Sequence, residues 1–229
     1  MKETKVSRSK LILSTIGRLL FFAILWGVIF FLPAGTFDFW EAWVVVAILF
    51  IPFIIASIYW FKTDTGVVER RAKRSEKDTG QKSIVKLLYL FFFLAFLIPG
   101  FDKRFEWSMV PVYLVIIADV LLLLGYGICF YVVAKNRFAG RTIEVEEDQP
   151  VISDGLNAIV RHPMYMGITL MCVSLPLALG SWWAMIPALL VIPVLVGRIQ
   201  SEERLLTREL KGYPEYIQKT RYRLFPGIW

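Results

Sequence analysis

Residues 164–199 read MYMGITLMCVSLPLALGSWWAMIPALLVIPVLVGRI, two apolar runs separated only by Gly180-Ser181. Their one charged residue, Arg198, lies next to the end of the second run. A bilayer core takes about 20 helical residues, so both runs are short for a full crossing. The sequence therefore predicts a tight hairpin of two helices. Either helix could be too short to span the full bilayer on its own.

Four more apolar stretches precede this hairpin, and each is long enough for a membrane-spanning helix. The first exceeds the apolar region of a secretory signal and ends without a small-residue cleavage site, so it is interpreted as a membrane helix. The six predicted spans are residues 11–32, 40–61, 84–100, 109–134, 164–180 and 182–199.

The composition agrees with an all-α polytopic membrane protein of about six transmembrane helices. Hydrophobic residues make up 57% of the chain, and the mean hydropathy is +0.59. A soluble domain of this size could not bury so much apolar surface, whereas helices that face lipid keep it from water.

Segments rich in Lys and Arg alternate along the chain with segments that have few. The rich segments are the N-terminal tail, the loop 62–83, the segment 135–163 and the tail after residue 199. By the positive-inside rule, both termini are predicted to be cytoplasmic. The membrane is expected to be the plasma membrane if the source is prokaryotic. The net charge of +7 is interpreted as contact with anionic membrane lipids, not with nucleic acid.

The chain is expected to divide at residue 108. Residues 1–108 would hold three membrane helices and a basic cytoplasmic loop. Residues 109–229 would form a catalytic membrane half that ends in a cytoplasmic amphipathic helix and tail. The tail mixes Arg221 and Arg223 with aromatic residues, which predicts packing at the membrane interface. These aromatic residues are Tyr213, Tyr216, Tyr222, Phe225 and Trp229.

Small residues within the spans predict packing. Gly125-Tyr126-Gly127 follows no strand, so close helix packing is favoured over a nucleotide-binding loop. Cys129 and Cys172 lie in apolar runs, and two isolated cysteines support neither a disulfide framework nor a metal site.

Two polar patches flank the hairpin. Arg161-His162-Pro163 precedes it, where Pro163 suits the first turn of a helix and His162 is the single histidine of the chain. After the hairpin, Arg198 and Glu202 share one face of a continuous helix, with Glu203 about 100° further round. This second patch fits either a surface ion pair or a functional site.

At these patches the sequence resembles the isoprenylcysteine carboxyl methyltransferase family, integral-membrane enzymes that use S-adenosylmethionine. The resemblance covers about residues 135–229. Either patch alone would be a weak match, and their order around one short hairpin makes it stronger. The resemblance is carried by Val151-Ile152-Ser153-Asp154-Gly155, by Arg161-His162-Pro163-Met164-Tyr165-Met166-Gly167, and by Arg198 with Glu202-Glu203 and Leu206.

The resemblance implies an S-adenosylmethionine site and the catalytic residues Arg198, Glu202 and Glu203. Glu202 matches an acidic residue that contacts the methyl donor, and Arg198 matches one placed toward the substrate carboxylate. The family commonly has Tyr in place of Asn157, and His or a similar group in place of Gln149. The residues that match donor-pocket positions are Gln149, Pro150, Val151, Ile152, Asn157, His162, Pro163, Met164, Tyr165 and Glu202.

The identity of the acceptor stays open. The resemblance favours a lipophilic acceptor, a small molecule or a prenylated one, whose carboxylate needs no general base. A lipid amine or a small thiol is the alternative, and an amine would need Glu203 or His162 as a base.

Two other classes of protein also stay open. Sterol-type reductases that use a nicotinamide cofactor resemble this chain in Arg161-His162-Pro163 and in the ending Tyr222-Arg223-Leu224-Phe225-Pro226. Those reductases are typically much longer. A non-catalytic membrane scaffold is the third possibility, in which the polar patches serve packing alone.

Overall fold

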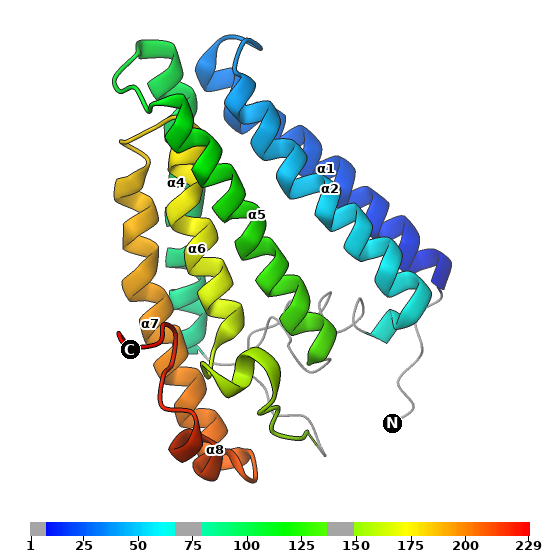
Figure 1. Ribbon diagram of the computed structural model, residues 1–229. Coiled ribbons are helices and arrows are strands. Elements are labelled where there is room, and N and C mark those ends of the chain that lie inside the picture. The colour runs from blue at the N-terminus through cyan, green and yellow to red at the C-terminus, as the bar shows by residue number, and fades with distance from the viewer. Residues whose placement is uncertain (1–7, 67–78, 137–148) are drawn as a thin grey trace.

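The structure is a computed structural model that describes residues 8–66, 79–136 and 149–229. Within these ranges the regular structure is helical, and the one strand-like pairing is an isolated bridge between Val160 and Tyr222. The prediction of an all-α protein is confirmed. The elements, shown in Figure 1, are α1 (Arg8–Ala34), α2 (Trp40–Thr63), α4 (Thr79–Phe105), α5 (Val112–Lys135), the short helix η1 (Gly155–Ala158), α6 (Pro163–Ala178), α7 (Met185–Glu209) and α8 (Tyr213–Lys219).

Parts of three predicted features lie outside the described residues. They are the start of the basic N-terminal tail (residues 1–7), most of the basic loop (67–78) and the start of the polar region before the hairpin (137–148).

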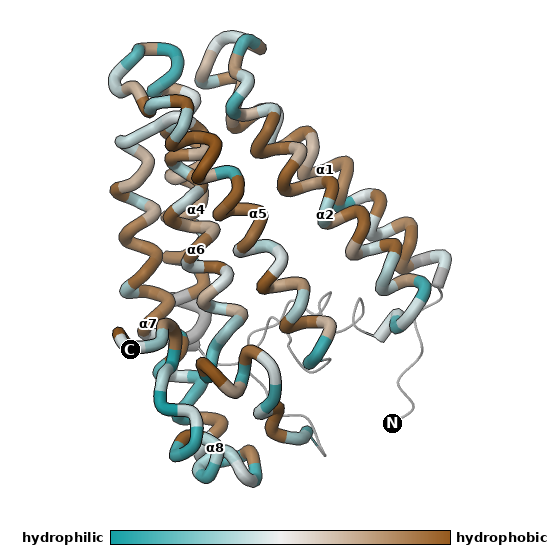
Figure 2. The backbone as a smooth tube through the Cα atoms, in the orientation of Figure 1, coloured by the Kyte–Doolittle hydropathy of each residue, from teal (hydrophilic) through white to brown (hydrophobic). Residues whose placement is uncertain are grey.

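Five of the described helices are long and apolar enough to cross a membrane: α1, α2, α4, α5 and α7. Their positions agree with five of the six predicted spans, and apolar residues run along each of them in Figure 2. The remaining predicted span is α6, which has 16 residues. That length corresponds to about 24 Å, less than a bilayer core of about 30 Å.

The two arms of the hairpin differ in length. Whereas α6 is short, α7 has 25 residues and continues beyond the apolar run to Glu209. Arg198, Glu202 and Glu203 therefore lie on one unbroken helix, as the four-residue spacing predicted. The predicted amphipathic tail helix is divided, because its first part extends α7 and only the seven residues of α8 follow.

Among the described residues the helices pack in a closed ring to which α6 belongs. Each packs against the next in the order α1, α2, α5, α6, α7 and α4, and α4 returns to α1. α6 also touches α2 and α4, so it contacts more of the other helices than any other member of the ring does, and more than half of its residues are buried. A helix enclosed by protein need not match the thickness of the lipid, which accounts for its short length.

Glycine permits the closest helix crossing, between α5 and α6. A Cβ atom on Gly125 would lie 2.7 Å from the carbonyl oxygen of Gly167, and one on Gly167 would lie 2.8 Å from Cys129 Sγ. Neither position has room for a side chain. The packing predicted for Gly125 is confirmed, whereas a Cβ atom on Gly127 would meet no atom of the described residues within 4 Å.

Buried polar contacts fix the hairpin tip to α4. Gly180 has a φ of +72°, which lets the chain turn without strain. The hydroxyls of Ser108 and Ser181 both donate to the carboxylate of Asp102, whose side chain is buried. Since a buried carboxylate needs such donors, these contacts hold the end of α4 beside the turn.

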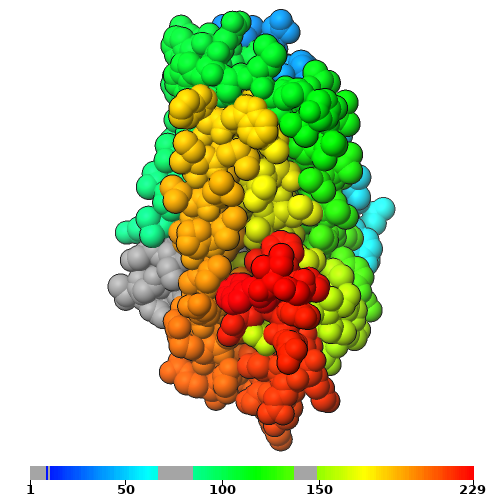
Figure 3. All heavy atoms as spheres, turned by 60° about the vertical axis from the view of Figure 1, so that its left-hand side comes forward, coloured from blue at the N-terminus to red at the C-terminus, as the bar shows by residue number. Residues whose placement is uncertain are grey.

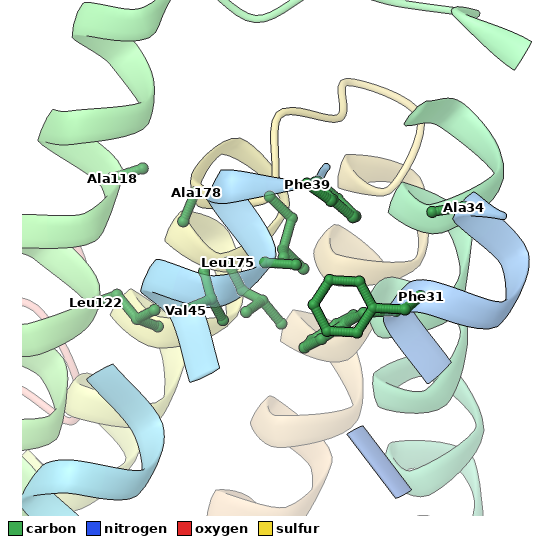
Figure 4. Close-up of a cluster of buried hydrophobic side chains, with 11 residues drawn as sticks. Phe31, Ala34, Phe39, Val45, Ala118, Leu122, Leu175 and Ala178 are labelled. Atoms are coloured by element: carbon green, nitrogen blue, oxygen red, sulfur yellow. The ribbon is translucent and has the colours of Figure 1, made fainter. Parts of the chain in front are cut away.

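Apolar packing joins the first two helices to the rest at the same end of the molecule. The side chains of this cluster come from α1, the start of α2, α5 and the end of α6, as Figure 4 shows. Leu175 and Leu179 lie at its α6 side. The cluster consists of Phe30, Phe31, Ala34, Phe39, Ala42, Val45, Ala118, Leu122, Leu175, Ala178 and Leu179.

The glycine crossing gives a stability prediction. We expect Gly125→Ala to lower the unfolding temperature in detergent by several degrees, because overpacking a tight contact costs about 1–3 kcal/mol. Gly127→Ala, on the same helix in open space, is the matched control and should leave the unfolding temperature unchanged or slightly raised. Equal unfolding temperatures for the two variants would contradict the close crossing.

Candidate functional site

A cavity of about 470 Å³ lies where α5 ends and α6 begins. Its volume is within the range of about 300–1,000 Å³ that is usual for small-molecule pockets. Its walls come from α4, α5, α6, α7, α8 and the connection of residues 149–162, called the connecting segment below. The structure brings together in this wall the predicted residues Gln149, Pro150, Val151, Ile152, Asn157, His162, Pro163, Met164, Tyr165, Arg198 and Glu202.

The cavity has a polar end and an apolar end. The polar end is formed by the connecting segment, α8 and the last turns of α7, including Glu202. The apolar end lies one to three helical turns deeper in the ring, where α4, α6 and α7 supply hydrophobic side chains. These side chains are Leu88, Phe92, Ile168, Met171 and Leu195.

The wall formed by α4 was not anticipated from the sequence. Val85, Leu88, Tyr89 and Phe92 follow helical spacing and face the cavity. Every membrane helix carries such apolar stripes, so the sequence held no signal to single this one out. The cavity therefore extends beyond the predicted catalytic half of residues 109–229.

Tyr165 connects the two predicted catalytic residues that line the cavity. Its hydroxyl donates to Glu202 Oε2 at 2.7 Å and accepts from Arg198 Nε at 3.0 Å. Arg198 is 7% exposed and Tyr165 is 6% exposed, so their contact is shielded from water, whereas Glu202 is half-buried. The result is a carboxylate and a guanidinium held side by side at the junction of the polar and apolar ends.

Glu203 points away from the cavity into a cluster of cationic side chains. Arg161 Nε donates to its Oε1 at 2.6 Å, and Arg223 Nε donates to its Oε2 at 2.7 Å. His162 Nε2 lies 3.3 Å from Oε1. Glu203 is 7% exposed, so its negative charge depends on these partners. The predicted catalytic role of Glu203 stays a prediction.

Arg161 also attaches the C-terminal tail. Its Nη1 donates to the carbonyl oxygens of Thr220 at 3.1 Å and Arg221 at 3.2 Å. The backbone N–H groups of Arg161 and His162 each donate at 2.9 Å to a carbonyl of the tail, those of Tyr222 and Arg223. In Figure 3 the tail, drawn in red, lies across the start of α6 and against α7.

The aromatic residues of the tail do not share one environment. Tyr213 is 4% exposed and Tyr216 is 5% exposed, and both line the cavity. Phe225 and Trp229 are partly buried and pack against the cluster that contains Leu195. The predicted interface packing is wrong for Tyr213 and Tyr216, because the connecting segment covers them.

The connecting segment is anchored to α5 and α8. Gly155 has a φ of +58° and lies against the hydroxyl of Tyr131, where a side chain would clash. The carbonyl oxygen of Asn157 accepts from the Tyr216 hydroxyl at 2.7 Å and from the Thr220 hydroxyl at 3.3 Å. The backbone of Asn157 thus positions α8, whatever its side chain binds.

Comparison with known proteins points to the same part of the chain. Residues 113–212 match the phospholipid methyltransferase family, a family of integral-membrane methyltransferases. The match begins in α5, ends just before α8 and includes the connecting segment, Arg198 and Glu202. A search of curated proteins finds no match. The family match supports a methyltransferase, and the apolar helices support a membrane protein.

The ion cluster gives a prediction that separates structure from chemistry. Glu203→Gln keeps the side-chain shape but removes the charge shared by Arg161 and Arg223. Breaking a buried ion pair costs about 3–5 kcal/mol, so we expect the unfolding temperature to fall by several degrees and the tail to become sensitive to protease. Glu209→Gln, at the exposed end of the same helix, is the control and should behave as wild type. A wild-type unfolding temperature for Glu203→Gln would contradict a stabilising role.

Proposed function

We propose that this protein transfers a methyl group from S-adenosylmethionine to a lipophilic acceptor, with a carboxylate of isoprenylcysteine type as the leading candidate. The observation that carries the proposal is the cavity in which Glu202 and Arg198 meet through Tyr165. One side of this pair is polar and the other is apolar, as a charged, water-soluble donor and a lipid-like acceptor require.

The polar end suits the donor. S-Adenosylmethionine supplies a methyl group activated by a sulfonium, together with an ammonium, a carboxylate and an adenosine. Glu202 would accept a charge-assisted hydrogen bond from the ammonium. Polar groups of residues 149–152 and the side chain of His162, which is 5% exposed, line the same end and would hold the remainder.

The apolar end suits the acceptor. The hydrophobic residues of α4, α6 and α7 would bind its hydrocarbon chain, and Arg198 would orient its carboxylate with a planar pair of donors. Methyl transfer to a carboxylate needs no proton removal. The protein then acts mainly by positioning the two reactants and excluding water, for which a buried Arg198 and Tyr165 are well placed.

A phospholipid amine is the second candidate, and the family match is the observation that favours it. Arg198 would then contact the lipid phosphate. An amine must lose a proton, however, and the carboxylate of Glu203 already binds Arg161 and Arg223, which leaves His162 as the candidate base. A carboxylate acceptor needs no base, and for that reason it remains the leading candidate.

We further propose that the polar end of the cavity faces the cytoplasm. The basic segments expected to be cytoplasmic precede α4 and follow α7, and both helices have their cavity-lining parts near those segments. A soluble donor would then enter from the cytoplasm and the acceptor from the surrounding lipid.

The role of Glu202 is tested by binding. We expect Glu202→Gln to weaken S-adenosylmethionine binding about tenfold or more in calorimetry of the detergent-solubilised protein, because a charge-assisted hydrogen bond is lost. NADPH is titrated in parallel into the wild type. Binding of NADPH alone would favour the reductase alternative, and binding of neither would contradict both enzyme classes.

Arg198 is tested by turnover. For Arg198→Ala we expect donor affinity to persist while turnover of an S-farnesylcysteine carboxylate falls about a hundredfold, since a charged hydrogen bond to the acceptor is removed. Tyr165→Phe is the control, because it breaks the link to Glu202 and retains both charged groups. Full turnover by Arg198→Ala would make Arg198 a structural residue. Turnover of phosphatidylethanolamine in place of the carboxylate would favour the second candidate.

A further inference from the structure

The hydroxyl of Tyr213 is an unusual group in the cavity wall. Tyr213 is 4% exposed, and its hydroxyl oxygen is buried without a hydrogen-bond partner among the residues that the structure describes. The other buried tyrosines of the cavity, Tyr165 and Tyr216, both donate to a protein oxygen. Buried hydroxyls are nearly always paired, so an unpaired one that lines a cavity indicates a ligand contact.

The position of Tyr213 is fixed by its surroundings. It is the first residue of α8, directly after Gly212, whose φ of +88° turns the chain away from α7. Its ring contacts that of Tyr216 with centroids 5.6 Å apart, and both rings pack with Leu210 and Val151. The ring is held on all these sides, so the hydroxyl cannot swing out to water without disturbing the cluster.

The charges near Tyr213 indicate which kind of ligand atom it would meet. Burial, followed by the neighbouring carboxylates of Glu203 and Glu202, raises the pKa of Tyr213. The phenol is therefore neutral and can donate its hydrogen. The same two carboxylates outweigh the opposing charge of Arg161 at this hydroxyl. They therefore disfavour an anionic ligand group there, which argues against the carboxylate of the methyl donor. Neutral acceptor atoms, such as ring nitrogens and ribose oxygens, are compatible.

The apolar faces beside the hydroxyl suit a flat heterocycle. Val151, Leu206 and Leu210 pack against the rings of Tyr213 and Tyr216. The surfaces beside the Tyr213 hydroxyl are therefore hydrophobic. Glu202 takes the ammonium in the function proposed above, so the adenosine half must occupy another part of the polar end. The connecting segment and α8 form that part.

We propose that Tyr213 binds the adenosine half of S-adenosylmethionine by donating its hydroxyl hydrogen to a neutral nitrogen or oxygen of the nucleoside. This inference rests on the proposed function and assigns to the donor site a residue that the sequence comparison did not indicate.

The test compares two ligands in calorimetry and in thermal unfolding of the full-length protein in detergent. S-Adenosylhomocysteine contains both halves of the donor skeleton, and 5′-methylthioadenosine contains only the adenosine half. For Tyr213→Phe we expect the affinity for both ligands to fall by about the same factor, roughly tenfold. The unfolding temperature without ligand should stay equal or rise, because the variant buries no unpaired hydroxyl.

Two matched variants make the result specific. Glu202→Gln should weaken S-adenosylhomocysteine but leave 5′-methylthioadenosine unchanged, since it affects the methionyl half. Tyr216→Phe removes the hydrogen bond to the Asn157 carbonyl. It should therefore lower the unfolding temperature without ligand, as Tyr213→Phe should not.

Each other outcome overturns the inference in a recognisable way. If the wild type binds neither ligand, the proposed function itself fails. If the wild type binds both and Tyr213→Phe binds them equally well, the contact does not exist. Loss of affinity for S-adenosylhomocysteine alone would place Tyr213 against the methionyl half. A lowered unfolding temperature with unchanged affinity would make the hydroxyl structural.

Discussion

The carboxylate of Glu203 is the point at which three separate parts of the chain are joined. It lies on α7, and it binds Arg161 before α6 and Arg223 in the tail. Arg161 in turn holds the carbonyls of Thr220 and Arg221. Without this charge, the buried guanidinium of Arg161 would lose its counter-charge beside the half-exposed Arg223, and the tail would lose part of its hold on the start of α6. The cavity wall beside His162 depends on that attachment.

The unequal arms of the hairpin place the site at one end of the ring. Because α6 is enclosed by other helices, it can be short. It begins only at Pro163, which leaves room for the connecting segment before its first turn. α7 starts among apolar residues and continues to Glu209. Its last turns therefore place polar residues beside the connecting segment. A site that must accept both a soluble and a lipophilic reactant is thus assembled from one short helix and one long one.

Much of the fold could be predicted because it follows from local physics. Apolar runs of sufficient length specified five spans, and the spacing of Arg198 and Glu202 specified a shared helix face. The prediction was weaker wherever the partner is distant in sequence. Nothing local distinguishes the stripe of α4 that lines the cavity from one that faces lipid, and nothing local shows that the aromatic side chain of Tyr213 is covered by the connecting segment.

Most residues predicted for the candidate site line one cavity, but their arrangement could not be predicted. The resemblance grouped Arg198, Glu202 and Glu203 together, whereas the structure separates them. Tyr165 links the first two within the cavity, whereas Glu203 does not line the cavity and binds Arg161 and Arg223. Adjacent residues on a helix point about 100° apart, so neighbours in sequence can belong to different environments.

The pairing of Glu202 and Arg198 through Tyr165 has a consequence for charge balance. The two side chains cancel one another, so the cavity junction is neutral next to an apolar wall. In the proposed reaction a donor of net charge +1 and a carboxylate of charge −1 become two products without net charge. Opposite charges attract strongly in a poorly polarisable setting, and their mutual neutralisation is favoured there. A neutral junction beside an apolar wall would favour binding of the cationic donor and the anionic acceptor together. The products have no net charge, so neither leaves a net charge in the membrane.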